Sequence, residues 1–193
     1  MPVAATEIRT TVTVGALAWG HRSAMSSASA FCEDPASVRL GQALALRVSE
    51  MTRSAAAAAV AVGLIELTSP RFAQQIRDVH TLTSRAIARF LITGEGTTET
   101  ERNFITRVGI FAARYGLSLA ILSRSYVVWR DANLRVVNEE VNRLGIGQTV
   151  SNVARNIIRS SADTGLRRMA RAYEYQLHVA AREENSLEEA SVH

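Results

Sequence analysis

The chain has 193 residues, a formal net charge of +4, 47% hydrophobic residues and 21% charged residues. This length suits one domain with a real core, and the balance of apolar and charged residues excludes disorder as the default. Aromatic residues make up only 6%, alanine is abundant and every basic residue is arginine, so packed helices are favoured over sheets. Arginine and glutamate are interspersed rather than gathered on one stripe, and we therefore expect no nucleic-acid partner.

The first 33 residues carry no clear helical or strand pattern, and we expect an irregular N-terminal arm there. Cys32 is the single cysteine, so an internal disulfide is excluded, and a small buried residue is favoured over a redox switch. We find no secretory signal pattern, and the longest apolar stretch, 55–65, is about half of the roughly 20 residues that span a membrane. We expect a cytoplasmic protein with no membrane partner.

The first helix start is marked by Asp34 and Pro35. Aspartate can cap exposed N–H groups, and proline fits the first helical position because its missing N–H is not needed there. The apolar pattern predicts a helical stretch from here to about Leu67, with a break between residues 49 and 54.

Ser69 and Pro70 repeat this start signal, and the glycines at 94–96 end the helix that follows. The apolar residues between these signals recur at steps of 4 and 3, which places them on one helix face. The expected buried residues are Phe72, Ile76, Val79, Thr83, Ala86 and Phe90.

Thr98 and Glu101 have the spacing of a capping box, which predicts a helix start. Gly116 is a natural C-terminal cap for that helix. The buried face expected for this helix consists of Phe104, Val108, Phe111 and Tyr115. Ser118 then begins another helix. Its expected face consists of Leu119, Leu122, Tyr126, Trp129, Asn133 and Val136.

A glycine turn at 145–147 precedes the last predicted helix, which runs from Gln148 to about Glu189 with a bend near Gly165. No segment has a convincing sheet pattern. The sequence therefore predicts an all-α fold: a globin-like helical bundle of about five main helices with a long C-terminal connecting helix.

The last helix also has a heptad pattern from residue 166 onward, interrupted at Glu184. Such a pattern is typical of a coiled-coil seam. Two interpretations stay open: a parallel homodimer, or a helix that folds back on its own bundle. The residues of this predicted dimer and signalling helix are Leu166, Ala170, Tyr173, Leu177, Ala180 and Leu187.

Few residues carry a recognisable chemistry. None of the four histidines, His21, His80, His178 and His193, pairs with another at metal-ligand spacing, and there is no phosphate loop or nucleophile elbow. We therefore expect no enzyme, no metal and no cofactor. The open alternative is haem binding through His80, because a globin-type haem needs one proximal histidine.

Aromatic residues and flanking arginines on two consecutive helices offer the richest local chemistry. They can line a pocket for an unidentified small molecule or form plain core. The candidate pocket residues are Tyr115, Tyr126, Trp129, Arg114 and Arg130.

The residues RYGLSL at 114–119, followed by AILSRSY at 120–126, carry a resemblance to a known family. They resemble the N-terminal sensory domain of RsbR-type stressosome co-antagonists and PucR-type regulators, where a similar turn precedes a similar helix. The same stretch is similar to the last helices of globin-coupled sensor domains. Aligning the turns places Ala86 where those sensors carry the haem-binding histidine, so the resemblance implies a haem-free, globin-like relative.

The residues 189–193, after the seam, are similar to the connection that precedes diguanylate cyclase (GGDEF) catalytic domains. Together the resemblances imply an arm at 1–33, a helical sensory domain at 34–165, and a coiled-coil signalling helix at 166–193 leading to an output domain absent from this chain. The implied function is a non-catalytic input domain in cyclic di-GMP signalling. A haem-based gas sensor, a stressosome-type protein-interaction module and the input domain of a transcription regulator stay open.

Overall fold

The computed structural model describes residues 34–191, with side chains up to residue 186. The expected N-terminal arm with His21 and Cys32 lies outside the described residues, as do His193 and the side chain of Leu187. Every regular element between residues 34 and 191 is a helix, which confirms the all-α prediction for that part of the chain. No helix in this range is both long and apolar enough to cross a membrane.

Short connections join the successive helices. The elements are α3 (Pro35–Leu46), α4 (Val48–Ala61), the 3-10 helix η2 (Ile65–Thr68), α5 (Pro70–Thr93), α6 (Glu99–Arg114), α7 (Leu119–Leu144) and α8 (Gln148–Ser191).

The first helical stretch differs from the prediction at its break and at its end. The chain breaks at Arg47 rather than between residues 49 and 54, and the helix ends at Ala61 rather than at Leu67. Gly63 adopts a positive φ of 77°, and the Leu64 N–H donates to the carbonyl of Ala59. This arrangement is a Schellman motif, which stops a helix by satisfying its last carbonyls.

The predicted helix starts at residues 34, 98 and 118 are confirmed by their capping bonds. Asp34 Oδ1 accepts a hydrogen bond from the Ala36 N–H at 2.8 Å, and Ser118 Oγ accepts one from the Ile121 N–H at 3.3 Å. Thr98 and Glu101 form the complete capping box. Helix α5 begins at Pro70 as predicted, although the Ser69 side chain makes no capping bond.

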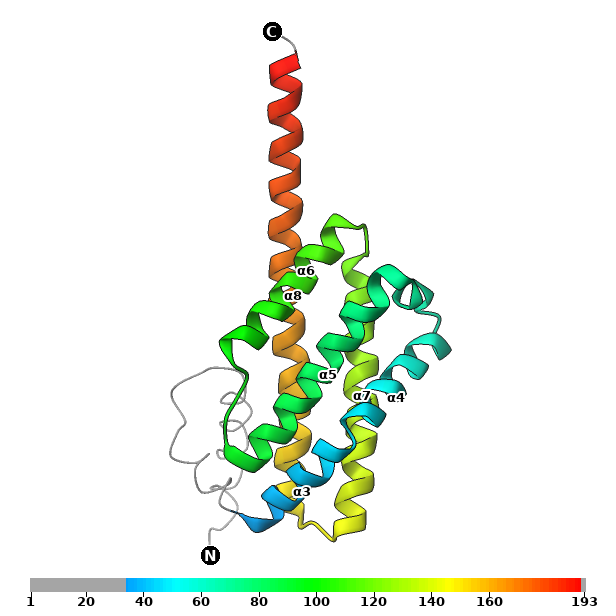
Figure 1. Cartoon of the computed structure of the whole chain (residues 1–193), viewed down its shortest axis with the longest axis vertical. Coiled ribbons are helices and arrows are strands. Elements are labelled where there is room, and N and C mark those ends of the chain that lie inside the picture. The colour runs from blue at the N-terminus through cyan, green and yellow to red at the C-terminus, as the bar shows by residue number, and fades with distance from the viewer. Residues whose placement is uncertain (1–33, 192–193) are drawn as a thin grey trace, which may run out of the picture.

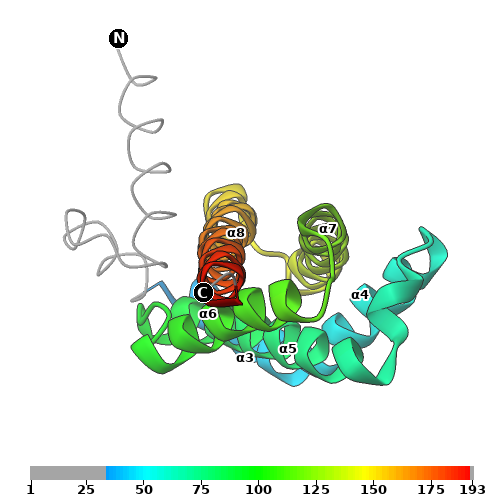
Figure 2. The ribbon, with the colours of Figure 1, turned by 90° about the horizontal axis from the view of Figure 1, so that it is seen from above.

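The helices form two layers. Helices α7 and α8 run antiparallel as a hairpin in one layer, and α3 to α6 lie obliquely across it in the other (Figures 1 and 2). Helix α6 packs against α8, and α4 packs against α7. The core lies between the layers; its largest fully buried side chains include Trp129, Phe90, Met51, Leu91, Ile105 and Ile157.

The predicted buried face of α5 is confirmed at all six positions, and that of α7 at every position except the half-buried Leu119. The prediction for α6 is confirmed at Val108, whereas Phe104 and Phe111 are only half-buried and Tyr115 is exposed. Its buried residues are Ile105, Val108, Gly109 and Ala112, whereas Tyr115 is 48% exposed. At Gly109 the α6 backbone approaches α8 so closely that an added Cβ would lie 2.4 Å from the Met169 carbonyl oxygen. The side of α6 with the small residues therefore faces α8, and Phe104 and Phe111 lie at the edge of this buried face.

Helix α8 continues through Gly165 without ending there. Met169 and Ala172, beyond the predicted domain boundary at 165, are still buried in the bundle. From Glu174 to Ser186 no residue is buried, and this part of the helix projects beyond the other helices (Figure 1). We call residues 174–191 the projecting segment of α8. The bundle therefore ends about two helical turns later than the sequence pattern suggests.

Candidate functional site

A buried polar cluster connects α5 with α7. The Trp129 Nε1–H donates to Ser84 Oγ at 3.3 Å, and the Ser84 hydroxyl donates to Asn133 Oδ1 at 3.0 Å. The Asn133 amide in turn donates to the Trp129 carbonyl at 2.7 Å. Because each group fixes the next, this closed set of bonds holds the Trp129 ring in one orientation between the two helices.

Two further side chains flank the Trp129 ring. The His80 ring of α5 lies with its centroid 6.2 Å from that of Trp129, and the Tyr126 ring of α7 lies 6.4 Å away, edge to face. Tyr126 also lies directly against Gly165 of α8, where an added Cβ would be 2.9 Å from Cε1 and 3.1 Å from the hydroxyl oxygen. The Trp129 cluster therefore joins three helices. Its members are His80, Ser84, Tyr126, Trp129 and Asn133.

The His80 Nε2 and the Tyr126 hydroxyl are buried without a hydrogen-bond partner in the described part of the chain. Burial lowers the pKa of His80 from 6.5 to about 3 and raises the pKa of Tyr126, because both charged forms would lose their hydration. Both groups are therefore uncharged at neutral pH. Each retains the capacity to hydrogen-bond to a further group, and a neutral imidazole nitrogen can also bind a metal.

The five residues of the predicted pocket do not come together in one site. Tyr126 and Trp129 lie in the Trp129 cluster, but Arg114 and Tyr115 lie exposed at the end of α6. The ring centroids of Tyr115 and Phe111 are 4.5 Å apart, and Arg130 Nε lies 2.9 Å from Asp131 Oδ1. The reason is the turn at Gly116, which follows directly and leaves the last residues of α6 outside the core.

Sequence reasoning singled out His80 and Trp129 but missed the hydrogen bonds of Ser84 and Asn133 that hold the Trp129 ring beside His80. A signal was present, since His80 and Ser84 are four residues apart on α5, and Trp129 and Asn133 are four residues apart on α7. That spacing places each pair on one face of its helix. What the sequence does not contain is the level at which α5 and α7 cross.

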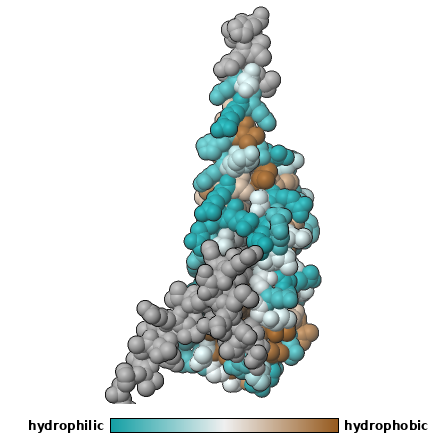
Figure 3. Space-filling view, turned by 90° about the vertical axis from the view of Figure 1, so that its left-hand side faces the viewer, coloured by the Kyte–Doolittle hydropathy of each residue, from teal (hydrophilic) through white to brown (hydrophobic). Residues whose placement is uncertain are grey.

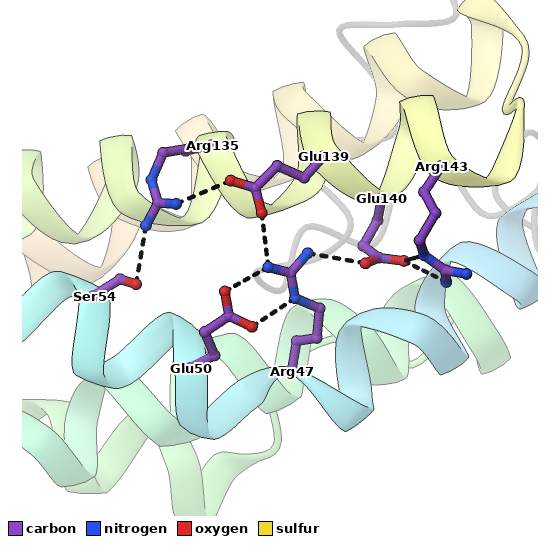
Figure 4. Close-up of polar contacts among 7 residues, drawn as sticks. All are labelled: Arg47, Glu50, Ser54, Arg135, Glu139, Glu140 and Arg143. Carbon is purple, nitrogen blue, oxygen red and sulfur yellow. Dashed lines mark hydrogen bonds and ion pairs between the residues drawn. The ribbon is translucent and has the colours of Figure 1, made fainter.

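A second polar cluster joins the break between α3 and α4 to α7 (Figure 4). Arg47 stands at the break and points its guanidinium at three carboxylates. Its Nε donates to Glu50 at 2.7 Å, its Nη2 donates to Glu139 at 2.7 Å, and its Nη1 donates to Glu140 at 2.9 Å. One side chain thus fixes the angle between α3 and α4 by attaching the break to α7.

Further arginines complete this Arg47 network. Arg143 donates to Glu140 at 2.6 Å, and Arg135 bridges Glu139 and Ser54, each at 2.9 Å. Hydrogen bonds from Arg143 and then from Arg47 hold the pKa of the Glu140 carboxyl below its usual value. The network contains equal numbers of arginines and glutamates and is fully paired, so we interpret it as structural.

The predicted seam residues of α8 have two different environments. Leu166 and Tyr173 are half-buried and pack against the core of their own bundle, and Ala170 is also half-buried. Leu177, by contrast, is 47% exposed, and Ala180 lies on the projecting segment with it. His178 of this segment is exposed. The fold-back interpretation therefore describes the first half of the seam, and only the second half is open to a partner.

Known proteins provide no assignment of family or function for this chain. No family model, curated protein or solved structure matches it. Within residues 34–186, no three histidine, cysteine, aspartate or glutamate side chains are grouped so that they could hold a metal ion.

Proposed function

We propose that this chain is a non-catalytic input domain of a bacterial signalling protein, which controls a C-terminal output domain through α8 in a homodimer. The observation that carries the proposal is the two-part environment of α8. Its first part is buried against α6 and α7, and its last part projects from the bundle as the same continuous helix. At a rise of 1.5 Å per residue, its 44 residues extend over about 66 Å.

This arrangement lets a change in the bundle reach the far end of the helix. Gly165 lies against Tyr126, and Met169 lies against Gly109, so α8 is held by close contacts with both α7 and α6. Two packings of these contacts would give two positions of the projecting segment. A signal would shift their balance by binding one packing more tightly than the other.

The open half of the seam supports the proposed homodimer. Leu177 and Tyr175 are exposed apolar residues of the projecting segment, and Figure 3 shows brown apolar groups among teal ones on this upper part of the molecule. A second copy would cover these groups by pairing its own projecting segment in parallel. The sequence resemblances support a haem-free, globin-like sensory domain and favour a diguanylate cyclase as the output domain.

The dimer is tested by replacing Leu177. We expect Leu177→Gln to raise the dissociation constant of the dimer at least tenfold, because two buried leucines, worth roughly 1.5–3 kcal/mol each, leave the seam. Leu46→Gln is the matched control, since Leu46 is 88% exposed on α3, away from α8. Light scattering across a concentration series measures both variants. A monomeric wild-type chain, or an equal effect of the two substitutions, contradicts the proposal.

A haem-based gas sensor is the second candidate, favoured by the unpartnered Nε2 of His80. An absorbance spectrum of the chain purified from haem-supplemented cells tests it. A Soret band that His80→Ala abolishes would establish this candidate, whereas a chain without that band supports the haem-free input domain.

A further inference from the structure

An acidic residue interrupts the seam on the projecting segment of α8. The seam residues alternate at steps of 4 and 3, so Leu177 and Glu184 occupy a positions of the heptad, and Tyr173 and Ala180 occupy d positions. A coiled coil places apolar residues at both positions, and a polar residue there lowers the stability of the pair. Glu184 is therefore the weak point of the seam.

The positions that flank the seam on this segment are also acidic. Glu174 and Glu188 occupy e positions, and Glu183 occupies a g position. The basic residue of the segment, Arg182, falls at an f position, and His178 falls at a b position, both on the side of the helix away from the seam. The seam and its flanks thus carry glutamates and no basic residue.

The bundle does not compensate these charges. No residue from Glu174 to Ser186 is buried, and no other described helix lies beside this part of α8 (Figure 1). Within the described part of the chain, none of the ion pairs includes a glutamate of the projecting segment. In a parallel homodimer each a position faces the same position of the other copy, so Glu184 would meet the partner's Glu184.

We infer that the projecting segment is an acid-sensitive dimerisation element, in which protonation of Glu184 strengthens the parallel pairing of two copies. The inference rests on the proposed homodimer and adds its regulation. Two ionised carboxylates that face each other repel, and such a pair takes up a proton at a higher pH than an isolated carboxylate does. Once one of the two is protonated, it can donate a hydrogen bond to the other across the seam. Acid therefore favours the dimer.

The dissociation constant of the dimer tests this inference, measured by analytical ultracentrifugation of the full chain over a concentration series. Two unit charges about 6 Å apart, at an effective dielectric constant of about 40, change this constant roughly tenfold. We therefore expect Glu184→Gln to lower the constant roughly tenfold at about pH 7.5. The wild-type constant should fall at least about threefold between about pH 7.5 and about pH 5.5. The constant of Glu184→Gln should respond less than half as strongly on a logarithmic scale.

Two controls separate Glu184 from other charges. Glu66→Gln removes one exposed carboxylate per copy from η2, outside the projecting segment, and should leave the constant unchanged. His178→Gln removes a group that titrates in the same pH range, and the acid response should survive in this variant.

The possible results distinguish this inference from the homodimer itself. A dimer whose constant does not fall in acid, or that Glu184→Gln does not strengthen, overturns the inference and leaves the homodimer in place. Loss of the acid response in His178→Gln also overturns it, because the histidine would then be the sensor. A chain that stays monomeric at both pH values, with and without Glu184→Gln, overturns the homodimer and the inference together.

Discussion

Arg47 and Arg135 show how burial determines the value of an ion pair at the scale of the single residue. Both arginines bind Glu139, but the Arg47 side chain is 22% exposed and also holds Glu140, whose side chain is 5% exposed. Arg135 is 55% exposed. Removing Arg47 leaves the nearly buried Glu140 with Arg143 as its remaining arginine and takes away the guanidinium bound to Glu50, whereas exposed pairs contribute at most about 1 kcal/mol.

We therefore expect Arg47→Ala to lower the free energy of unfolding by about 2 kcal/mol and Arg135→Ala by less than about 1 kcal/mol. Denaturant unfolding followed by circular dichroism measures both. Equal losses would show that the Arg47 network does not hold the break between α3 and α4 in solution.

His80 gives the folded chain a specific pH dependence. Burial lowers its pKa from 6.5 to about 3, so below pH 6.5 the unfolded chain binds a proton that the folded chain does not. The free energy of unfolding is therefore not reduced by His80 above pH 6.5, and it decreases as the pH falls from 6.5 toward 3. We expect a slope of up to about 1.4 kcal/mol per pH unit in this window.

The variant His80→Phe should remove that slope, measured as the free energy of unfolding between pH 6.5 and about pH 5.5, where most carboxylates are still ionised. Thr83→Val serves as the control, because Thr83 is buried on the same helix but has no titratable group. A slope that survives in His80→Phe would assign the pH dependence to other groups.

At the scale of the element, the glycines of α6 and α8 decide how closely these helices approach. Helix propensity alone favours alanine over glycine by about 1 kcal/mol inside a helix. At Gly109 a steric clash outweighs this gain, because the added Cβ would lie 2.4 Å from the backbone oxygen of Met169. Backbone cannot move aside as a flexible side chain does, so the two helices would have to separate.

We expect Gly109→Ala to destabilise the chain by roughly 1–3 kcal/mol, the usual cost of overpacking, despite its better helix propensity. Gly147→Ala is the control for the added Cβ, which meets nothing within 4 Å there; because Gly147 is the N-cap of α8, we expect a loss of at most about 1 kcal/mol. Thermal unfolding of the two variants gives the comparison. A Gly109→Ala variant as stable as the wild type would contradict the close α6–α8 crossing.

At the scale of the whole molecule, the bundle and the projecting segment of α8 have separate roles. No side chain between Glu174 and Ser186 is buried, whereas Met169 and Ala172 belong to the bundle. Residues that bury little surface contribute little to folding. The segment is therefore dispensable for the fold, and it is the part of α8 on which the proposed homodimer depends.

A chain ending after Tyr173 should keep the helical content and the unfolding midpoint of the bundle within a few degrees, but should no longer form the dimer. Circular dichroism and light scattering measure the two properties. A truncated chain that unfolds would show that the projecting segment is needed for the fold, and a truncated chain that still dimerises would place the interface elsewhere.

The sequence by itself determined the all-α fold class, the starts of α5, α6, α7 and α8, and the buried faces of α5 and α7. These features depend on interactions within a few residues, such as the Thr98–Glu101 capping box and the apolar spacing from Phe72 to Phe90. Helix starts and buried faces depend on local spacing, so they can be predicted without knowing which helices pack together.

Only the tertiary structure decided the rest. The α6 face turned toward Gly109 because the backbone of α8 approaches there, and the first helix broke at Arg47, whose carboxylate partners lie 92 and 93 residues away on α7. The Trp129 cluster likewise exists because α5 and α7 cross at the level of Ser84 and Asn133. Contacts between distant residues depend on how whole helices pack, and the periodicity of one helix does not specify which helix packs against it.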